Sequence, residues 1–408
     1  MSRRWLLPLV PLYAAAVALR NRRIENGSQR VRSLHFPVVS IGNLSTGGSG
    51  KTPLTIALAK ALRQRALNVD VLSRGYGRQS RLPARVHPNG SAEDFGDEPI
   101  LIARETCLPV YVAPQRYDAG LLAEAEMLTS MVKGTGSTGC PKTRNGGRRG
   151  FQPPHKANNI NAGFSPGFVN TANLRRILEF FRSLFSPYTE ASKNLGALAP
   201  DVRPSKATDP AGGQIVHLLD DGFQHRQLHR DIDVVLLNRA DWHDKLLPAG
   251  NLREPLNSIR RAAILAIPAD DPDLEPDLRN WGWQGPIWRL SRTMQVPVID
   301  GPVMAFCGIA RPQQFFRGLE SAGLTLAVRK AFPDHHRYTN ADLRSLQASA
   351  AAAGATALIT TEKDYVRLAK FASAFPETMP LKTAQLRIEI EDKTVESLLE
   401  MLAGNLYR

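Results

Sequence analysis

Cysteine is scarce in this 408-residue chain, and none of its three cysteines, Cys107, Cys140 and Cys307, forms a CxxC pair with another. This scarcity suggests neither a disulfide framework nor a thiolate zinc site, and it fits a reducing compartment. The chain also lacks an HExxH motif and any repeat that is visible in the sequence. With 43% hydrophobic and 22% charged residues, it is not a largely disordered protein, and it is long enough for two domains.

Acidic residues are outnumbered, with 38 Asp and Glu against 52 Lys and Arg, which gives a formal net charge of +14. Such an excess indicates an anionic partner: a nucleic acid, an acidic lipid surface or a phosphorylated substrate. The sequence has no interleaved stripe of aromatic and basic residues of the kind that binds nucleic acid. We therefore expect no nucleic-acid partner.

The N-terminal apolar run, Trp5–Leu19, is short for a bilayer span, which needs about 20 apolar residues. It is interrupted by Pro8 and Pro11, and arginines flank it on both sides. These features predict a membrane-associated helix over residues 1–30 that lies on a bilayer surface. Two alternatives stay open, a cleaved signal peptide and a helix docked on the protein core.

Short apolar runs alternate with helical patterns through the first two thirds of the chain. Leu54, Leu58 and Leu62 recur at helical spacing between the two apolar runs Phe36–Ile41 and Asn68–Leu72. Further strands are expected at Pro109–Ala113, Ile215–Leu219, Asp233–Leu237 and Ala263–Ile267, with a helix over Tyr117–Val132. The alternation predicts an α/β domain with a mostly parallel, doubly wound sheet, which we assign to residues 31–296.

A second, smaller α/β domain is predicted for residues 297–408. Its expected strands are 302–308, 325–328 and 357–361, and its expected helices begin near Pro312, cover Asn340–Ala353 and follow Asp364. Within the first domain, residues 133–213 are rich in Gly, Pro, Asn and basic residues and lack an apolar period, which predicts a flexible insertion. Only Leu174–Phe185 has a helical pattern there, and we assign the insertion no chemistry.

A glycine-rich turn, GNLSTGGSGKT, lies between the first strand and the following helix. It departs from the general phosphate-loop pattern GxxxxGK[ST], because Ser45 stands where that pattern has its first glycine. It keeps backbone amides that can converge on phosphate, Lys51 for the outer phosphates and a Thr52 hydroxyl for Mg²⁺. The predicted nucleotide-binding residues are Ser45, Thr46, Gly47, Gly48, Ser49, Gly50, Lys51 and Thr52.

Two pairs of acids are candidates for holding Mg²⁺ and acting on a phosphoryl acceptor. Asp220 and Asp221 follow an apolar strand, where a phosphate-loop protein places its metal-side acid. Asp97 and Glu98 precede Pro99 at a helix start, near the positive end of the helix dipole. For both pairs, helix capping or plain solvation is the alternative interpretation.

Two groups of histidines accompany these acids. His225 and His229 are four residues apart, and on a helix they would lie on one side near Asp221, which is an alternative divalent-metal site. His335 lies on a loop after a strand, far along the chain from the glycine-rich turn. It is either a surface histidine or a base, or the partner of a base, contributed across an interdomain cleft.

Seven motifs occur in an order that resembles the tetraacyldisaccharide 4′-kinase family, which phosphorylates the lipid A precursor of Gram-negative bacteria. They are SIGNLSTGGSGKTP, LSRGYGR, GDEP, DDGFQHRQLHRDIDVVLLN, LLPAGNLREP, FPDHHRYT and TTEKDYVRL. The resemblance covers about residues 1–131 and 214–408. The family pattern GNxxxGGxGKT accounts for Ser45.

The resemblance implies two α/β/α domains, the first of which resembles a P-loop NTPase, and an N-terminal helix on the cytoplasmic face of the inner membrane. It implies transfer of the γ-phosphate of ATP to the 4′-hydroxyl of a tetraacyldisaccharide 1-phosphate, with Mg²⁺ as cofactor. By the same resemblance, Asp97 is the base and His335 its partner. Thr52, Glu98, Asp220 and Asp221 are the expected metal ligands, and Arg74, Arg78, His225, Arg253 and Glu254 the expected substrate-binding residues.

A P-loop protein that uses hydrolysis to drive a partner, such as a metal-insertion or transport GTPase, is the alternative from another class. Guanine specificity is typically marked by an NKxD stretch, and TEKD at Thr361–Asp364 resembles it only weakly. The sequence sets no oligomeric state.

Overall fold

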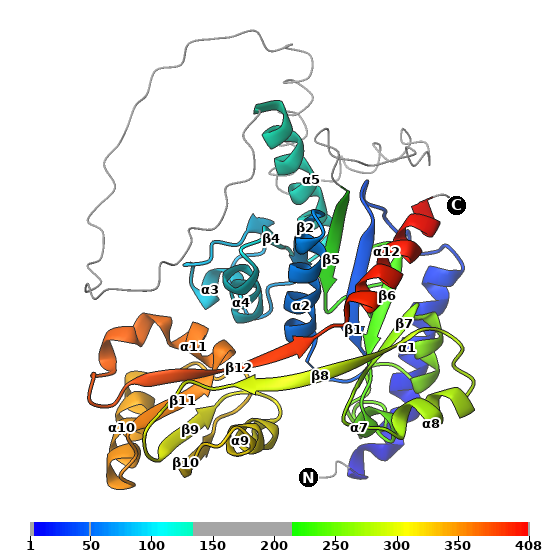
Figure 1. Ribbon diagram of the computed structural model, residues 1–408. Helices are drawn as coiled ribbons and strands as arrows, with labels where there is room; N and C mark the ends of the chain where they lie inside the picture. Colours follow the sequence, from blue (N-terminus) through cyan, green and yellow to red (C-terminus); the bar gives the residue numbers. More distant parts are fainter. Residues whose placement is uncertain (1–3, 49, 134–213, 407–408) are drawn as a thin grey trace, which may run out of the picture. The chain divides into compact units, whose positions relative to one another are not determined.

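One continuous twelve-stranded sheet runs through the part of the chain that the structure describes (Figure 1). The computed structural model describes residues 4–48, 50–133 and 214–406. The predicted insertion therefore lies outside the described residues apart from Lys133, and so does the helical pattern at Leu174–Phe185. The strand order is β10-β9-β11-β12-β8-β7-β6-β1-β5-β2-β4-β3.

The strands are β1 (Val38–Asn43), β2 (Asn68–Ser73), β3 (Ala84–Arg85), β4 (Val110–Val112), β5 (Ile215–Asp220), β6 (Ile232–Leu236), β7 (Ile264–Pro268), β8 (Ile287–Gln295), β9 (Val303–Cys307), β10 (Leu326–Ala331), β11 (Ala357–Thr361) and β12 (Leu381–Glu389). The α-helices are α1 (Val10–Glu25), α2 (Lys51–Gln64), α3 (Ala92–Phe95), α4 (Asp97–Thr106), α5 (Arg116–Lys133), α7 (Arg239–Trp242), α8 (Leu274–Asn280), α9 (Pro312–Ser321), α10 (Asn340–Ala352), α11 (Glu362–Leu368) and α12 (Asp392–Leu406). Short 3₁₀ helices cover η1 (Arg4–Leu9), η3 (Leu256–Arg261) and η4 (Ala369–Ala374).

Among the described strands, neighbours are parallel except for the pairs β3–β4 and β8–β12. The predicted mostly parallel α/β class is therefore confirmed. The antiparallel β8–β12 pair connects the strands of the N-terminal half to those of the C-terminal half. The described residues belong to one compact unit, and the predicted boundary between residues 296 and 297 falls between β8 and β9. The division into two domains stays a prediction.

Most elements expected from the sequence occur within two residues of their predicted bounds, including every expected strand of the N-terminal half. The prediction that the last expected helix follows Asp364 is wrong, because α11 begins at Glu362. The Thr361 hydroxyl accepts the backbone N–H of Asp364 at 3.1 Å and caps the first turn of α11. Asp364 therefore lies within the helix.

Side-chain alternation along the strands builds a core on each face of the sheet. On β9, Val303, Ala305 and Cys307 pack into one hydrophobic cluster with residues of α9, whereas Met304 and Phe306 pack into another with residues of α10. The sheet of the C-terminal half is thus covered by helices on both faces, as the alternation of strands and helices predicts.

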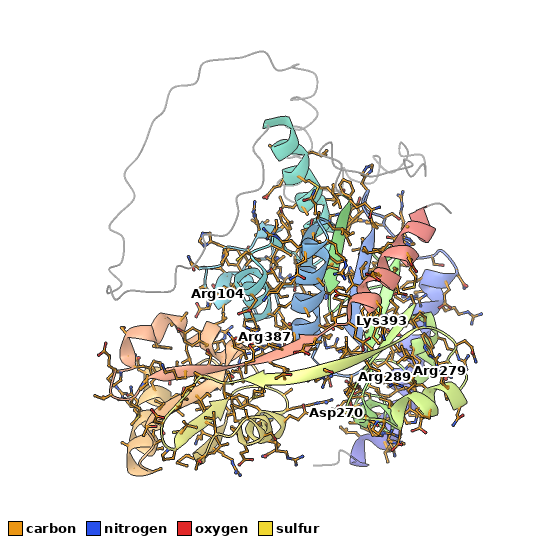
Figure 2. All side chains as sticks on the ribbon, in the orientation of Figure 1. Arg104, Asp270, Arg279, Arg289, Arg387 and Lys393 are labelled. Carbon is orange, nitrogen blue, oxygen red and sulfur yellow. The ribbon has the colours of Figure 1, made fainter. Side chains whose placement is uncertain are left out.

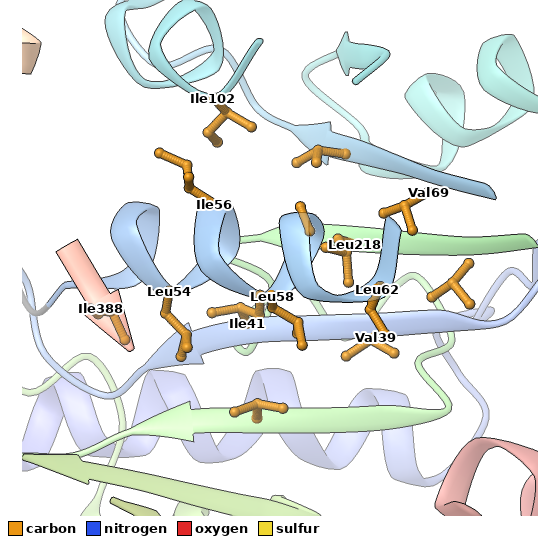
Figure 3. Close-up of a cluster of buried hydrophobic side chains, with 14 of the residues drawn as sticks. Val39, Ile41, Leu54, Ile56, Leu58, Leu62, Val69, Ile102, Leu218 and Ile388 are labelled. Atoms are coloured by element: carbon orange, nitrogen blue, oxygen red, sulfur yellow. The ribbon is translucent and has the colours of Figure 1, made fainter. Parts of the chain in front are cut away.

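Helix α2 packs along the central strands, as Figure 3 shows. Its apolar side chains at Leu54, Leu58 and Leu62 are fully buried and lie against β1, near Val39 and Ile41. This packing fixes the direction of α2 and with it the turn that precedes the helix. The start of α2 is therefore held at the carboxyl end of β1.

Helix α1 docks on the core by one face. The Tyr13 hydroxyl donates to the Arg253 carbonyl at 3.0 Å, Arg20 pairs with the buried Glu254 at 2.8 Å, and Val17 is buried. Other positions of α1 expose apolar side chains, with 72% of Leu12 accessible to solvent. In the described chain, no helix combines the length and the apolar character that crossing a membrane would require.

A buried ion cluster lies near the amino ends of the central strands. His217 of β5 is fully buried, with Nδ1 2.8 Å from Asp70 of β2 and Nε2 3.5 Å from Glu124 of α5. Burial acts to lower the pKa of His217, but the two carboxylates outweigh it and raise the pKa to about 10. His217 is therefore protonated at neutral pH.

Because the pKa of His217 is raised in the folded state, its stabilising contribution is complete below about pH 6.5 and is lost as the pH rises toward 10. We expect the free energy of unfolding to fall by up to about 1.4 kcal/mol per pH unit in that window. His217→Gln, followed by urea unfolding at several pH values, should remove this slope, whereas the exposed-site control His87→Gln should keep it. Equal slopes in all three proteins would contradict the assignment.

Candidate active site

Three neighbouring parallel strands end side by side at the candidate site. β1 runs into the glycine-rich loop (residues 44–50), β5 ends at Asp220, and β2 ends at Ser73. The register places Ile41 of β1 opposite Asp220 of β5. In open α/β sheets, ligands bind outside the carboxyl ends of the strands, which is where these segments meet.

The glycine-rich loop has the conformation that its glycines permit. Gly50 has φ 93° immediately before α2, a left-handed conformation that residues with a Cβ rarely adopt. At the end of β1, a Cβ on Gly42 would come within 2.5 Å of the Phe223 Cβ, so only glycine allows the 222–224 turn to approach. Ser49, a predicted nucleotide-binding residue, lies outside the described residues.

Lys51 is held at the start of α2 by polar contacts from two directions. Its Nζ donates to Asn43 Oδ1 at 2.8 Å and lies 3.2 Å from Asp221 Oδ1. Arg253 in turn donates to both oxygens of the Asp221 carboxylate at 3.0 Å. Burial acts to raise the pKa of Asp221, but the charges of Lys51 and Arg253 outweigh it and hold the pKa well below its usual range. Asp221 is therefore ionised.

Asp220 differs from its neighbour because it lacks such strong partners. Within the described residues, its carboxylate accepts two long hydrogen bonds, from the hydroxyls of Thr55 at 3.3 Å and Ser73 at 3.4 Å. Burial, together with the negative charges of Glu98 and Asp221, raises the pKa of Asp220 to about 7. Asp220 thus lies buried within reach of the negative charges of two partly exposed acids, Glu98 and Asp221.

Asp97 and His335 lie close together although they are 238 positions apart in the sequence. His335 Nδ1 lies 3.4 Å from Asp97 Oδ2, and Asp97 is buried in the first turn of α4. Burial acts to raise the pKa of Asp97, but its hydrogen bond with His335 and the charge of Arg367 outweigh it and lower the pKa. The hydrogen bond with Asp97 raises the pKa of His335. The structure thus brings together the two side chains that the resemblance pairs.

Two cavities adjoin these groups. One of about 560 Å³ is lined by most of the predicted site residues: Thr46, Gly47, Gly48, Gly50, Lys51, Thr52, Arg74, Glu98, Asp220, Asp221, Arg253 and His335. A second cavity, of about 860 Å³, is lined by Asp97. His335 and Arg367 line both cavities. Residues of the glycine-rich loop, the strand ends and the C-terminal half thus line two cavities that have His335 and Arg367 in common.

Some predicted site residues lie away from the wall of the smaller cavity. Arg78 donates to the Leu82 carbonyl at 2.9 Å, and the fully buried Glu254 pairs with Arg20 and Arg261. Ser45 is fully buried, and its hydroxyl accepts from Asn43 at 3.2 Å. Their predicted binding roles stay predictions.

The alternative metal site at His225 and His229 is wrong in its premise, because residues 221–231 form successive turns and no helix. The N–H of His225 donates to the Gly222 carbonyl at 2.8 Å within one of these turns. Burial, followed by the charges of nearby arginines, lowers the pKa of His225 to about 3, so its ring is neutral. Within residues 4–48, 50–133 and 214–406, no group of three His, Cys, Asp or Glu residues is arranged so that it could hold a metal ion.

Three cations of the site were not predicted from the sequence. Arg116 is buried at the start of α5 and donates to the Asp221 carbonyl at 3.2 Å. Lys363 forms an ion pair with Glu98, and Arg367 forms one with Asp97. Arg116 follows β4 at the carboxyl edge of the sheet, so the rule of strand ends could have indicated it. Lys363 and Arg367 are four residues apart on α11 and share one face.

The weak NKxD-like stretch has a structural role. The carboxylate of Asp364 is fully buried and accepts hydrogen bonds from the Gly308 N–H, the Tyr338 hydroxyl and the Thr361 hydroxyl. A carboxylate engaged in this way cannot read the edge of a guanine base. This observation disfavours the GTPase alternative.

A mostly parallel α/β sheet with a glycine-rich turn, a lysine at a helix start and acids at its carboxyl edge is typical of an α/β enzyme that acts on phosphate groups. Residues 2–132 and 206–403 match the family described as tetraacyldisaccharide-1-P 4′-kinase. The chain belongs to this family, and the resemblance found in the motifs is confirmed.

Relatives match over nearly the whole chain. A tetraacyldisaccharide 4′-kinase of Koribacter versatilis is 32% identical over 400 residues, covering 94% of each chain. One of Aquifex aeolicus is 29% identical over 401 residues, covering 94% of this chain and 95% of the relative. A crystal structure of LpxK from Aquifex aeolicus in complex with ATP aligns over 99% of both chains, with a TM-score of 0.61 and 26% identity.

Proposed function

We propose that the residues gathered at the carboxyl edge of the sheet carry out the reaction of the family in this chain. That reaction is the ATP-dependent phosphorylation of the 4′-hydroxyl of a tetraacyldisaccharide 1-phosphate, a step of lipid A biosynthesis. The observation that carries the proposal is the meeting of Asp97 and His335 beside the cavity that contains Lys51. A donor-holding lysine and an acceptor-activating acid are the two parts that phosphoryl transfer requires.

The glycine-rich loop is proposed to hold the phosphates of ATP as a P-loop. Its residues Thr46, Gly47, Gly48 and Gly50 line the cavity next to the N-terminus of α2, whose dipole favours negative charge. Lys51 would contact the outer phosphates and stabilise the charge that develops on them in the transition state. The positive side chains of Arg74, Arg116 and Arg253 line the same cavity and would hold the remaining phosphate groups of donor and acceptor.

Mg²⁺ fits the acids of the cavity. Thr52, Glu98, Asp220 and Asp221 line one cavity, and the pKa of Asp220 is raised first by burial and then by the negative charges of Glu98 and Asp221, which a cation would offset. Mg²⁺ typically takes only one or two carboxylates and completes its shell with phosphate oxygens and water. When bound, the ion neutralises charge on the transferred group.

Asp97 is proposed to accept the proton of the 4′-hydroxyl while that oxygen forms a bond to the γ-phosphorus and the bond to ADP breaks. His335 would orient the carboxylate through its 3.4 Å contact with Oδ2. Both Asp221, at φ 51°, and His335, at φ 57°, hold left-handed backbone conformations. Strained conformations of this kind are concentrated at functional sites, which supports a role for both residues.

Helix α1 is proposed to hold the enzyme at a lipid surface as a peripheral protein, on the cytoplasmic face of the inner membrane. Leu9 at the end of η1 and Leu12 and Leu19 of α1 are exposed, and the positive Arg22 and Arg23 follow. An exposed apolar stripe next to arginines suits an anionic bilayer surface. An acceptor with acyl chains remains in the leaflet, so the site must approach it there.

Replacing two of these leucines with acids, Leu12→Asp with Leu19→Asp, should weaken binding to vesicles of phosphatidylethanolamine and phosphatidylglycerol by at least about tenfold, because each leucine contributes through burial of its apolar surface. Co-sedimentation measures the effect. Val298→Asp is the matched control, since Val298 is 95% exposed elsewhere on the chain. Unchanged sedimentation of the double variant would place the membrane contact elsewhere.

Nucleotide and acceptor dependence test the proposed function directly. Purified full-length protein should form ADP from ATP rapidly only when the acylated disaccharide 1-phosphate is present, and it should prefer ATP to GTP. Hydrolysis that is indifferent to the acceptor, or faster with GTP, would favour the partner-driving NTPase instead.

A further inference from the structure

The guanidinium of Arg367 lies where α11 of the C-terminal half meets α4 of the N-terminal half. Its Nε donates to Asp97 Oδ2 at 2.8 Å, and its Nη2 contacts the same oxygen. Its Nη1 donates to the Gly308 carbonyl at 2.8 Å and to Asp364 Oδ1 at 2.9 Å. Only 8% of the Arg367 side chain is exposed, and these contacts hold its guanidinium from two sides.

Asp364 anchors this arginine from behind. Its carboxylate accepts the Gly308 N–H at 3.1 Å, the Tyr338 hydroxyl at 2.9 Å and the Thr361 hydroxyl at 2.6 Å. These donors come from three separate segments, so the position of Asp364 is set by the fold of the C-terminal half. The position of the Arg367 fork is set with it.

The contacts divide the two oxygens of Asp97. Oδ2 receives both contacts from Arg367 and lies 3.4 Å from His335 Nδ1. Oδ1 accepts the backbone N–H of Glu98 at 3.0 Å, which leaves it a second lone pair. A carboxylate held in this way can turn only one oxygen toward an incoming hydroxyl.

We infer that Arg367 is a positioning residue for the phosphoryl transfer. It orients the Asp97 carboxylate so that Oδ1 receives the proton of the acceptor hydroxyl. The inference rests on the proposed role of Asp97 as the base. Arginine suits the task because its planar fork fixes the orientation of a carboxylate, whereas the ammonium of lysine is a point charge with no preferred plane.

Three variants test this role. Arg367→Lys keeps the charge and loses the fork, and we expect kcat to fall by about 10²-fold, the cost of a small misplacement of a reacting group. The KM for ATP should stay within about twofold in Arg367→Lys and Arg367→Met. In Arg367→Ala, added guanidinium ion should restore part of kcat, whereas methylammonium at the same concentration should not.

A matched control tests whether Arg367 positions Asp97 or only links the N-terminal and C-terminal halves. Arg387 of β12, labelled in Figure 2, pairs with Glu105 of α4 at 3.0 Å and with Glu362 of α11 at 3.2 Å. It thus joins the same two helices away from Asp97. Arg387→Met should lower the unfolding temperature and leave kcat unchanged below it, whereas Arg367→Lys should lower kcat at temperatures where the protein is fully folded.

A double-mutant cycle with Asp97→Ala tests whether the effect of Arg367 on kcat acts through Asp97. If Arg367 acts through Asp97, Arg367→Met should cause no further fall in kcat in the Asp97→Ala background. A rise in the ATP KM with kcat unchanged, or full activity of Arg367→Lys, would overturn the inference while leaving Asp97 as the base. Near-normal turnover of Asp97→Ala would overturn the proposed base itself, whatever the Arg367 variants do.

Discussion

Lys51→Met is expected to lower kcat/KM by about 10²–10³-fold, the loss typical when one preorganised charge on a transition state is removed. The ammonium of Lys51 faces the cavity from the start of α2 and is held there by Asn43 and Asp221. Asp221 keeps Arg253 as a partner in the variant, so the fold should persist. Initial rates of acceptor-dependent ADP formation, with thermal unfolding, measure both effects.

Lys60→Met is the matched control for this variant. Lys60 lies on the same helix and pairs with Glu105 at 3.3 Å, so its replacement also removes one lysine and one ion pair from α2. We expect its turnover to equal that of the wild type. Turnover near the wild-type rate in Lys51→Met would mean that the glycine-rich loop does not hold the donor.

Asp97→Asn should lower kcat by about 10²–10⁴-fold, because removal of a general base costs that much, and it should change the ATP KM only slightly. The variant removes the proton acceptor but keeps the shape of the side chain. It also leaves Arg367 with Asp364 as its remaining carboxylate partner, so some loss of stability should accompany the kinetic effect. Steady-state kinetics well below the unfolding temperature separate the two.

Asp392→Asn provides the comparison for Asp97→Asn. Asp392 also lies in the first turn of a helix and pairs with an arginine, Arg65, at 2.6 Å, but it is largely exposed on α12. Its replacement should leave kcat unaltered. If Asp97→Asn instead raised the ATP KM and preserved kcat, Asp97 would be a nucleotide contact and not the base.

Local patterns were sufficient to predict much of the fold. The buried strands β1, β2, β5 and β6 are short apolar runs, and the turn before α2 has glycines and a lysine within a few residues. β8 and β12 could not be predicted in this way, because most of their side chains are not buried and their sequences contain many polar residues. Their pairing with each other supplies the stability that their composition does not indicate.

The candidate site likewise contains residues that local sequence patterns indicate and residues that they do not. Lys51, Asp220 and Asp97 occur beside strand ends or helix starts, where sequence alone indicates ligand binding. Arg367 carries no such local signal, because its partner Asp97 is 270 positions away in the chain. His225 was placed on a helix that does not form, because residue spacing alone cannot distinguish a helix from successive turns.

Transfer of label from [γ-³²P]ATP to a tetraacyldisaccharide 1-phosphate by the purified full-length protein tests the central claim most directly. The account predicts one labelled bisphosphorylated lipid for each ADP formed, with the label lost in Lys51→Met and Asp97→Asn. Formation of ADP with no label in the lipid, or labelling that survives in both variants, would contradict it.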